Sequence, residues 1–224
     1  MQRVRPALEP PGEALPDFDI IRAVGAALGA DLGCRTPAEA FAEMASLTPT
    51  FRGISHERLE RDGPIAWPCR DPADPGERTL YLQSFETPSG KAELSAVPYA
   101  EPGEGPSRDF PTLLVTGRRL EHYNSGTMTR RTANLDLVPE ELIELNRADA
   151  AELRIGDGER VLVESRRGGI EVTATVTDRV SPGQAFIGFH FPGSPANRLT
   201  SQHADETTGC PEYKVTAVRI SSRA

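Results

Sequence analysis

The pattern of apolar and polar positions changes twice along the chain. In residues 17–28 apolar side chains recur at helical spacing, which predicts an amphipathic helix closed by Gly29. Thr36 and Glu39 stand three residues apart around a proline, as in a capping box, and predict a second helix that runs to about Leu47. Neither helix carries evident chemistry, so both are interpreted as scaffold.

Prolines then interrupt the chain, and only short apolar runs remain between them. Residues 48–107 contain nine prolines, with strand candidates at 79–85 and 91–97. The turn-rich sequence EPGEGPSRD occupies residues 101–109. This composition predicts a segment that crosses from one domain to the next.

From residue 110 onward short apolar runs and alternating positions predict β structure. Two alternating runs are joined by a tight Arg-Arg-Gly-Gly connection and predict a β-hairpin. A short helical turn is expected at 139–145, and Asn146 can cap a helix at 147–153. About six short strands separated by turn signals predict a closed barrel. The clearest of them lie at 113–115, 160–165, 170–177, 185–189 and 213–220.

Charge and composition exclude several classes of function. The 224 residues carry a formal net charge of -8, which disfavours binding to nucleic acid or to an anionic membrane. No apolar run is long enough for a membrane span, and the N-terminus has no signal-peptide core. The three cysteines have no paired spacing, which argues against a metal or cluster site and favours a reducing, cytoplasmic compartment.

A basic loop stands against this acidic background. The apolar run at 113–115 leads into Thr116 and Gly117, and a segment rich in arginine, hydroxyl and amide groups follows as far as Arg131. Arginine forks grip phosphate, and glycine lets the backbone approach a ligand closely. An anion site and a solvated basic turn remain equally good interpretations of these residues alone. The pair at Arg166 and Arg167 is interpreted as surface decoration at a hairpin tip.

Further polar residues stand where other predicted strands end, and no catalytic constellation accompanies them. His190, Asn197 and the Tyr213-Lys214 pair all lie at such transitions. The sequence has no phosphate-binding P-loop, no nucleophile elbow and no GxGxxG motif, and Cys210 has no identifiable base beside it. The residues therefore predict a binding surface for a large ligand that carries phosphate and a heterocycle.

Three longer strings carry a resemblance to a known family. They are TGRRLEHYNSGTMTRR (116–131), FIGFHFPGSPANRLTS (186–201) and PEYKVTAVRI (211–220). Together they resemble the C-terminal part of the molybdopterin oxidoreductases, and among these most closely the catalytic alpha subunit of formate dehydrogenase. The earlier segments LTPTFRGISHERLE and FETPSGKAEL resemble the same subunit in the same order.

The resemblance implies a fold, a cofactor and a set of contact residues. The fold would be mainly β: a double-psi β-barrel at 110–224, preceded by a helical remnant of a truncated α/β domain at 1–50 and a Pro-rich crossing segment at 51–109. The cofactor would be a bis-molybdopterin guanine dinucleotide with molybdenum or tungsten. Residues that match the family's cofactor motifs are Thr116, Gly117, Arg118, Arg119, His122, Asn124, Gly126, Thr127, Met128, Thr129, His190, Asn197, Tyr213 and Lys214.

The resemblance also implies that the chemistry lies elsewhere. The family's metal ligand, its catalytic residues and its iron–sulfur cysteines precede the region matched here, so no catalytic or metal-binding residue is expected in this chain. The expected role is to bind the cofactor as part of a formate dehydrogenase, in company with the rest of the alpha subunit and electron-transfer subunits. Two alternatives stay open: a stand-alone carrier or assembly module, and the same domain of a relative such as nitrate reductase.

Overall fold

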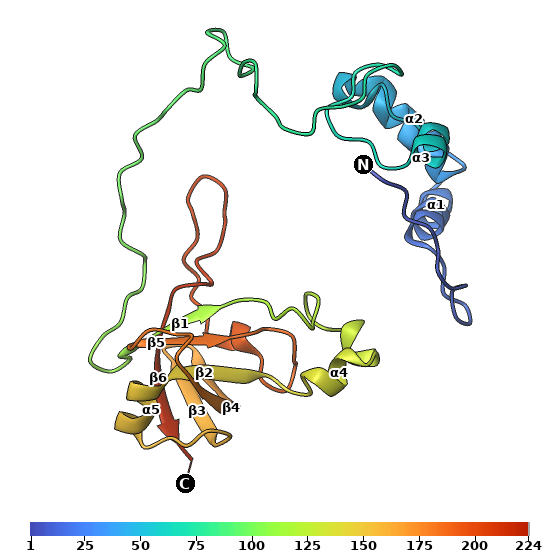
Figure 1. Ribbon diagram of the computed structural model, residues 1–224. Helices are drawn as coiled ribbons and strands as arrows, with labels where there is room; N and C mark the ends of the chain where they lie inside the picture. The colour runs from blue at the N-terminus through green and yellow to red at the C-terminus, as the bar shows by residue number, and fades with distance from the viewer. Residues whose placement is uncertain (224) are drawn as a thin grey trace. The chain divides into compact units, whose positions relative to one another are not determined.

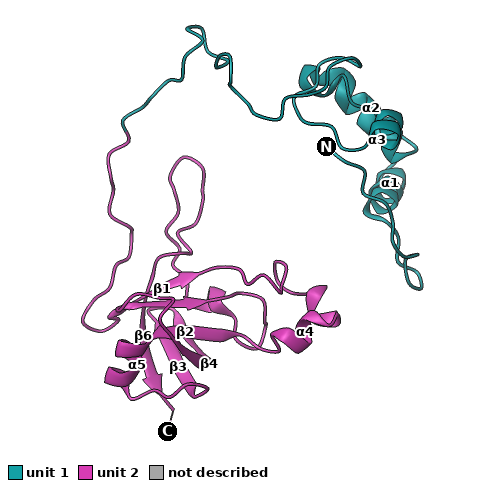
Figure 2. Ribbon diagram, viewed as in Figure 1, with its two compact units in different colours: residues 1–96 teal, residues 97–224 magenta. Residues whose placement is uncertain are grey.

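The protein folds into two compact units that are described separately. A computed structural model describes residues 1–223, and the chain divides into a first unit, Met1–Ala96, and a second that begins at Val97 (Figure 2). None of the helices in that described stretch has the length and apolar character that crossing a membrane requires.

The first unit is a small helical assembly. Its elements are α1 (Asp17–Ala27), α2 (Pro37–Leu47), η1 (Pro49–Phe51) and α3 (His56–Asp62) (Figure 1). The Thr36 hydroxyl accepts the backbone N–H of Glu39 at 3.2 Å, so the predicted N-terminal cap of α2 is confirmed. A core formed by Ile54, Leu59, Ile65 and Cys69, with Phe41 and Phe51 packed against it, holds α2, η1 and α3 together.

The Pro-rich middle of the chain does not form strands. The predictions of strands at 79–85 and 91–97 are wrong, because these residues form turns and irregular backbone. A strand is stable only when a partner satisfies its backbone groups, and no strand is described between α3 and residue 112 that could pair with them. The helix α3, in contrast, was not predicted; Ser55 caps it by accepting the N–H of Arg58 at 3.1 Å.

The second unit is built around a closed barrel of six strands in the order β1-β5-β2-β4-β3-β6 (Figure 1). The strands are β1 (Thr112–Thr116), β2 (Leu142–Asn146), β3 (Arg160–Ser165), β4 (Gly168–Thr177), β5 (Gln184–Ile187) and β6 (Thr216–Ser222). Shorter helical segments connect them: η2 (Thr129–Arg131), α4 (Asn134–Leu137), α5 (Arg147–Leu153) and η3 (Ala196–Arg198). The pairs β1–β5 and β2–β4 are parallel, and the other neighbours are antiparallel.

The strand order has an internal two-fold relation. Exchanging β1 with β4, β2 with β5 and β3 with β6 reproduces every pair of neighbours, and parallel pairs remain parallel. A helical segment follows the second strand of each half, α5 after β2 and η3 after β5. The C-terminal ends of β1 and β4 are therefore equivalent places in the barrel.

Alternate residues of these strands fill the barrel interior. Val161, Val163 and Val172 are fully buried, as the alternation in the sequence predicts. The helical turn predicted at 139–145 is wrong, because Leu142–Asn146 form β2 between β4 and β5. Ile143 and Leu145 are buried there, so strand pairing and burial outweigh any local helical preference.

The predicted fold class is confirmed, since a mixed six-stranded barrel of the double-psi type follows N-terminal helices. The three predicted domains at 1–50, 51–109 and 110–224 stay predictions. Residues 51–69 share a core with α2 inside the first unit.

Candidate functional site

The parallel pairing of β1 with β5 brings two polar loops to one edge of the barrel. Thr116 at the end of β1 pairs with Ile187 at the end of β5, and the chain leaves both strands in the same direction. The loop after β1 and the loop after β5 therefore begin side by side (Figure 1). Most of the predicted cofactor residues lie in these two loops.

His190 joins the two loops and is completely buried. Its Nε2 lies 2.9 Å from the backbone nitrogen of Arg119, which can only donate. Nε2 must therefore accept, the ring proton must sit on Nδ1, and Nδ1 donates to the carbonyl oxygen of Asn124. The imidazole is held as one neutral tautomer by two residues of the loop after β1, so His190 positions the two loops.

His122 plays a similar part inside the loop after β1. Its Nε2 donates to the carbonyl oxygen of Val138 at 2.9 Å, which leaves Nδ1 to pair with the Thr129 hydroxyl at 3.0 Å. The ring is 4 % exposed and packs edge-on against Phe191, with centroids 4.9 Å apart. Both ring nitrogens are thus engaged within the protein.

Arg119 turns inward, towards two buried carboxylates. Its guanidinium donates to Glu144 Oε1 at 3.2 Å and to the carbonyl oxygen of Leu142 at 3.0 Å. Its Nε lies 3.5 Å from Glu141, which also accepts the backbone N–H of His190 at 2.9 Å. These pairs neutralise Arg119 and fix the start of the loop after β1.

Two glycines of the predicted site allow close packing within the protein. At Gly117 an added Cβ would lie 2.5 Å from the ring of Phe186. At Gly126 the Cβ would lie 2.7 Å from the carbonyl oxygen of His190, and its φ of +70° disfavours other residues as well. Both glycines let the loop after β1 lie close against the β5 side of the barrel.

Two hollows open beside these loops. The first, which we call the Arg130 hollow, has a volume of about 240 Å³ and includes Ser125, Thr127, His190 and Asn197 in its lining. Its cation, Arg130, lies over the Phe191 ring at 6.0 Å, and its buried Nε has no hydrogen-bond partner among the described residues. Hydroxyl, amide and guanidinium groups thus meet around one space.

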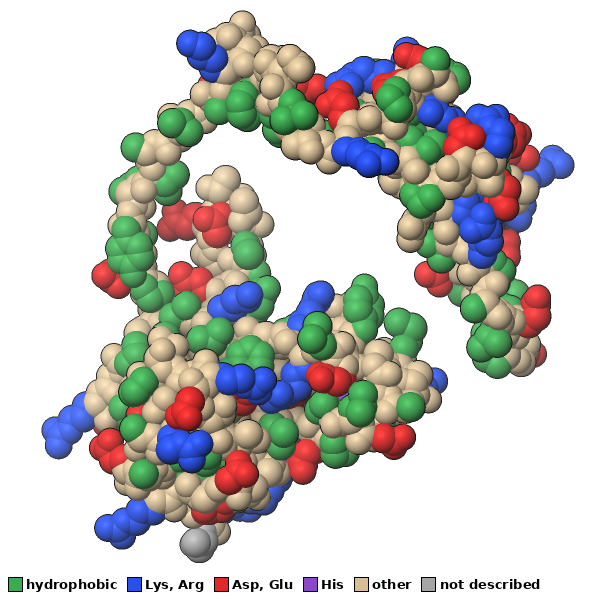
Figure 3. Space-filling view, in the orientation of Figure 1, with side chains coloured by type: hydrophobic (Ala, Val, Ile, Leu, Met, Phe, Trp, Pro, Cys, Tyr) green, Lys and Arg blue, Asp and Glu red, His purple; other side chains and the backbone are tan. Residues whose placement is uncertain are grey.

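The second, which we call the Arg118 hollow, has a volume of about 410 Å³. Arg118, Arg119 and Arg179 line it together with Glu144, Glu121 and Phe186. Arg118 is exposed, and it makes no ion pair or hydrogen bond within the part of the chain that the structure describes. Basic and acidic side chains are interspersed over the visible face of the barrel, so this face has no broad basic patch (Figure 3).

The remaining predicted residues are held less tightly. The Thr116 hydroxyl donates to the carbonyl oxygen of Tyr213 at 2.6 Å and so ties the chain before β6 to the end of β1. The side chains of Met128, Tyr213 and Lys214 are exposed, and so is that of Asn124. The structure therefore brings part of the predicted set together at the two hollows, and the contact of each residue with a cofactor stays a prediction.

Sequence reasoning missed the acidic half of this site. Glu141 and Glu144 bury their carboxylates behind the loop after β1, and Arg179 pairs with Glu144 from outside. Their only sequence signal is charge within the apolar string ELIEL, which is a poor fit to a surface helix. Arg130 lies in the basic loop but outside the set of residues that match the family's cofactor motifs.

The contacts of Arg167 contradict its interpretation as surface decoration. Predicted as surface decoration, it donates to both carboxylate oxygens of Glu104, at 2.5 and 2.9 Å, and to the carbonyl oxygen of Leu199. Glu104 also accepts the backbone N–H of Ala217 at 3.0 Å. These hydrogen bonds hold the pKa of Glu104 below its usual value, with that from Arg167 as the largest cause. The pair is a structural clamp on the barrel.

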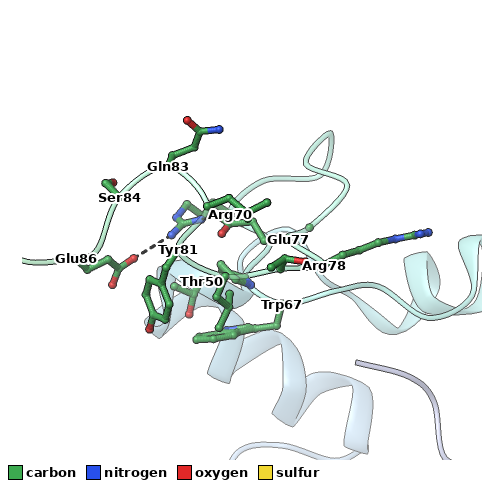
Figure 4. A pocket seen from close by; sticks show the side chains of 14 residues that line it. Thr50, Trp67, Arg70, Glu77, Arg78, Tyr81, Gln83, Ser84 and Glu86 are labelled. Atoms are coloured by element: carbon green, nitrogen blue, oxygen red, sulfur yellow. Dashed lines mark hydrogen bonds and ion pairs between the residues drawn. The ribbon is translucent and has the colours of Figure 1, made fainter. Parts of the chain in front are cut away.

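The first unit has a hollow of its own, of about 570 Å³. Trp67, Tyr81 and Arg78 line it, and Arg70 crosses it to reach Glu86 at 3.2 Å (Figure 4). It contains none of the predicted cofactor residues. Across residues 1–223 no group of three or more His, Cys, Asp or Glu side chains is placed to hold a metal ion.

Comparison with known proteins gives three kinds of similarity. Residues 112–217 match the family model described as "Molydopterin dinucleotide binding domain". The chain is 40% identical over 223 residues to the F420-dependent formate dehydrogenase 2 subunit alpha of Methanococcus maripaludis, covering 98% of this chain and 33% of the relative. It is 41% identical to the corresponding subunit of Methanocaldococcus jannaschii, with the same coverage, and 32% identical to formate dehydrogenase H of Escherichia coli, covering 98% of this chain and 31% of that protein.

A solved structure shows the same fold. Acetylene hydratase from Pelobacter acetylenicus superposes with a TM-score of 0.69 at 17% identity, over 96% of this chain and 34% of that one. The chain thus spans about a third of the length of the relatives that it matches.

Proposed function

Because residues 112–217 belong to the molybdopterin dinucleotide-binding domains, we propose that this chain binds molybdopterin guanine dinucleotide as the C-terminal part of a formate dehydrogenase catalytic subunit. The observation that carries the proposal is the similarity over 98% of the chain to formate dehydrogenase alpha subunits. This similarity extends beyond the barrel into the first unit. A protein that shared only the cofactor-binding barrel need not be similar to formate dehydrogenase in that unit.

The residues at the two hollows fit such a cofactor. Arg118 and Arg130 supply guanidinium groups for phosphate oxygens. Ser125, Thr127 and Asn197 supply hydroxyl and amide groups for the edges of a heterocycle, and they lie in the lining of one hollow. A buried Arg130 Nε with no partner among the described residues is the kind of donor that a bound anion satisfies.

The chain's own task would be to bind and orient the cofactor. When bound, the dinucleotide would bring a molybdenum or tungsten ion, whose two-electron redox chemistry would serve formate oxidation. His190 and His122 would keep the two loops in place, and the Arg119 ion pairs would fix the start of the loop after β1. Iron–sulfur clusters and electron-transfer subunits would belong to the rest of the enzyme.

A binding experiment and a reconstitution experiment test the proposal. The purified chain should bind extracted molybdopterin guanine dinucleotide, and an Arg118→Ala, Lys214→Ala double variant should bind it more weakly. Co-expression with a polypeptide equivalent to the other two-thirds of the Methanococcus maripaludis relative should yield formate-dependent dye reduction. Failure of the chain to bind the dinucleotide would overturn the proposal.

One relative supports a second candidate. The chain is 34% identical over 220 residues to the assimilatory nitrate reductase catalytic subunit of Bacillus subtilis. If the reconstituted complex reduced nitrate and left formate unchanged, that assignment would replace the first. A stand-alone carrier would bind the dinucleotide yet transfer it to an acceptor protein without gaining activity.

We also propose a cytoplasmic location. Its support is that Cys34, Cys69 and Cys210 are all free thiols, which suits a reducing compartment. Fractionation of cells that express the tagged full-length polypeptide would test it.

A further inference from the structure

We propose that Arg179, together with Arg118, binds the diphosphate group of the cofactor, and that Glu144 holds Arg179 in place until the ligand arrives. The inference rests on the proposed function and deepens it, because no motif of the sequence singles out Arg179. It starts from the position of Arg179 in the fold.

The two-fold relation of the barrel makes Arg119 and Arg179 counterparts. Arg119 follows the end of β1, Arg179 follows the end of β4, and these two strand ends are equivalent in the topology. Both guanidinium groups converge on one carboxylate oxygen, Oε1 of Glu144. On the β5 side Glu144 pairs with Phe186, whose ring lies 5.9 Å from the guanidinium carbon of Arg119.

The two arginines differ in how firmly they are held. Arg119 has a side chain that is only 12% exposed, and it is also bonded to Leu142 and close to Glu141. Arg179 has a side chain that is 69% exposed, and Glu144 is the one charged partner that the described residues give it. Arg119 stays within 3.2 Å of Glu144 when Arg179 leaves, so one of the two cations that contact this buried carboxylate remains in place.

Arg179 shares the Arg118 hollow with a second available cation. Arg118 and Arg179 both line the space of about 410 Å³, and Arg118 has no partner of its own among residues 1–223. Planar guanidinium forks bind phosphate oxygens in pairs, and two forks that line one hollow suit a diphosphate. The Arg179 side chain is 69% exposed and that of Glu144 is 6% exposed, so only the guanidinium has to move for a phosphate to replace Glu144 as its partner.

The test compares binding of two ligands, inorganic pyrophosphate and molybdopterin guanine dinucleotide, by isothermal titration calorimetry on the full chain. Arg179→Ala should weaken pyrophosphate binding about 10- to 100-fold, the loss expected for a charge-assisted hydrogen bond. Arg179→Lys should recover part of it. Arg160→Ala is the matched control: Arg160 is similarly exposed, at 51%, and pairs with Glu140 on the surface.

The two ligands separate the possible failures. Unchanged affinity of Arg179→Ala for both ligands would overturn the inference and leave the proposed function standing. Pyrophosphate binding that depends on Arg179, without any dinucleotide binding, would support the anion site and overturn the proposed function. Binding of neither ligand by the unaltered chain would overturn both, and circular dichroism of each variant would show that the barrel is intact.

Discussion

The backbone N–H of Arg119 donates a hydrogen bond to Nε2 of His190 across 2.9 Å, and this contact joins the loop after β1 to the loop after β5. Since Nε2 accepts, Nδ1 carries the proton and donates to the Asn124 carbonyl. A buried neutral imidazole therefore sets the spacing of the two loops that carry most of the predicted cofactor residues.

We expect His190→Ala to lower the free energy of unfolding of the barrel by about 2–4 kcal/mol, because it leaves a cavity and buried backbone groups without partners. His190→Gln should cost less, since its amide can still accept from Arg119. Denaturant unfolding followed by circular dichroism measures both. The exposed His203→Ala is the control, and equal losses in all three variants would contradict the positioning role.

A second prediction concerns Gly126. Its φ is +70°, and a Cβ there would approach the His190 carbonyl oxygen to 2.7 Å, so Gly126→Ala should cost about 2–4 kcal/mol and weaken cofactor binding. Gly158 has a similar φ of +80° but open space around its Cβ position. Gly158→Ala should therefore show only the backbone cost of about 1 kcal/mol. If the two variants unfold alike, the close approach at Gly126 is unimportant.

Most of the barrel could be predicted from sequence because its strands carry local signals. In β3 and β4 each buried valine alternates with a half-exposed residue, so the period of two is visible without knowing the partner strand. The strand β2 lacks that advantage, because it has only five residues and follows the sequence Pro-Glu-Glu, which is typical of a helix start. It forms a strand through pairing with β4 and β5. Such pairing depends on residues far along the chain, so the local sequence pattern does not predict it.

The position of the candidate site in the fold was predictable from the sequence, whereas the contacts of its side chains were less so. Arg118 and Arg119 are adjacent and chemically identical in sequence, yet one is exposed and the other is half-buried against Glu141 and Glu144. Those carboxylates lie more than twenty positions along the chain, and only the folded barrel brings them together. The site as a whole was found because polar residues gather at strand ends, which is visible in sequence.

A third prediction is a pH dependence at Glu104. Arg167 holds the pKa of this carboxyl below its usual value, so the pair contributes stability at pH values above the unfolded pKa of about 4.3. That contribution falls away as pH decreases through the lower folded pKa. Glu104→Gln should therefore flatten the loss of unfolding free energy between about pH 5 and pH 3. Unfolding curves at a series of pH values would show it, with the exposed Glu152→Gln as the control.

A fourth prediction concerns Arg58 in the first unit. Its guanidinium donates to the carbonyl oxygens of Gly53 at 2.7 Å and Asp74 at 2.7 Å, and it contacts Cys69 Sγ at 3.3 Å. Arg58→Ala should lower the stability of this unit by about 2–3 kcal/mol, because buried carbonyl groups lose their donors.

The fluorescence of Trp67 measures this effect, since it is the only tryptophan in the sequence and lies in the first unit. Arg61→Ala is a fitting control, because within residues 1–223 Arg61 pairs only with the neighbouring Asp62 at the surface. A loss of stability as large in Arg61→Ala would show that the effect comes from charge rather than from the carbonyl contacts.

The last prediction concerns the apolar face of α1. Ile21 and Val24 are 61% and 54% exposed, so the side chains that define this amphipathic helix are not covered within the first unit. Exposed apolar surface of this kind promotes association, and we expect the isolated chain to self-associate. Ile21→Lys with Val24→Lys should reduce self-association and change stability by less than about 0.5 kcal/mol, because the lost side chains were solvated and lysine favours helix.

Sedimentation velocity would measure the self-association, and Trp67 fluorescence the stability. Leu59, which is 5% exposed in the core of the same unit, provides the contrast: Leu59→Lys should unfold the unit, because it buries an unpaired charge. If the α1 double variant destabilised the unit as strongly, its apolar face would have to be covered in solution. If it left self-association unchanged, the association would arise from another surface.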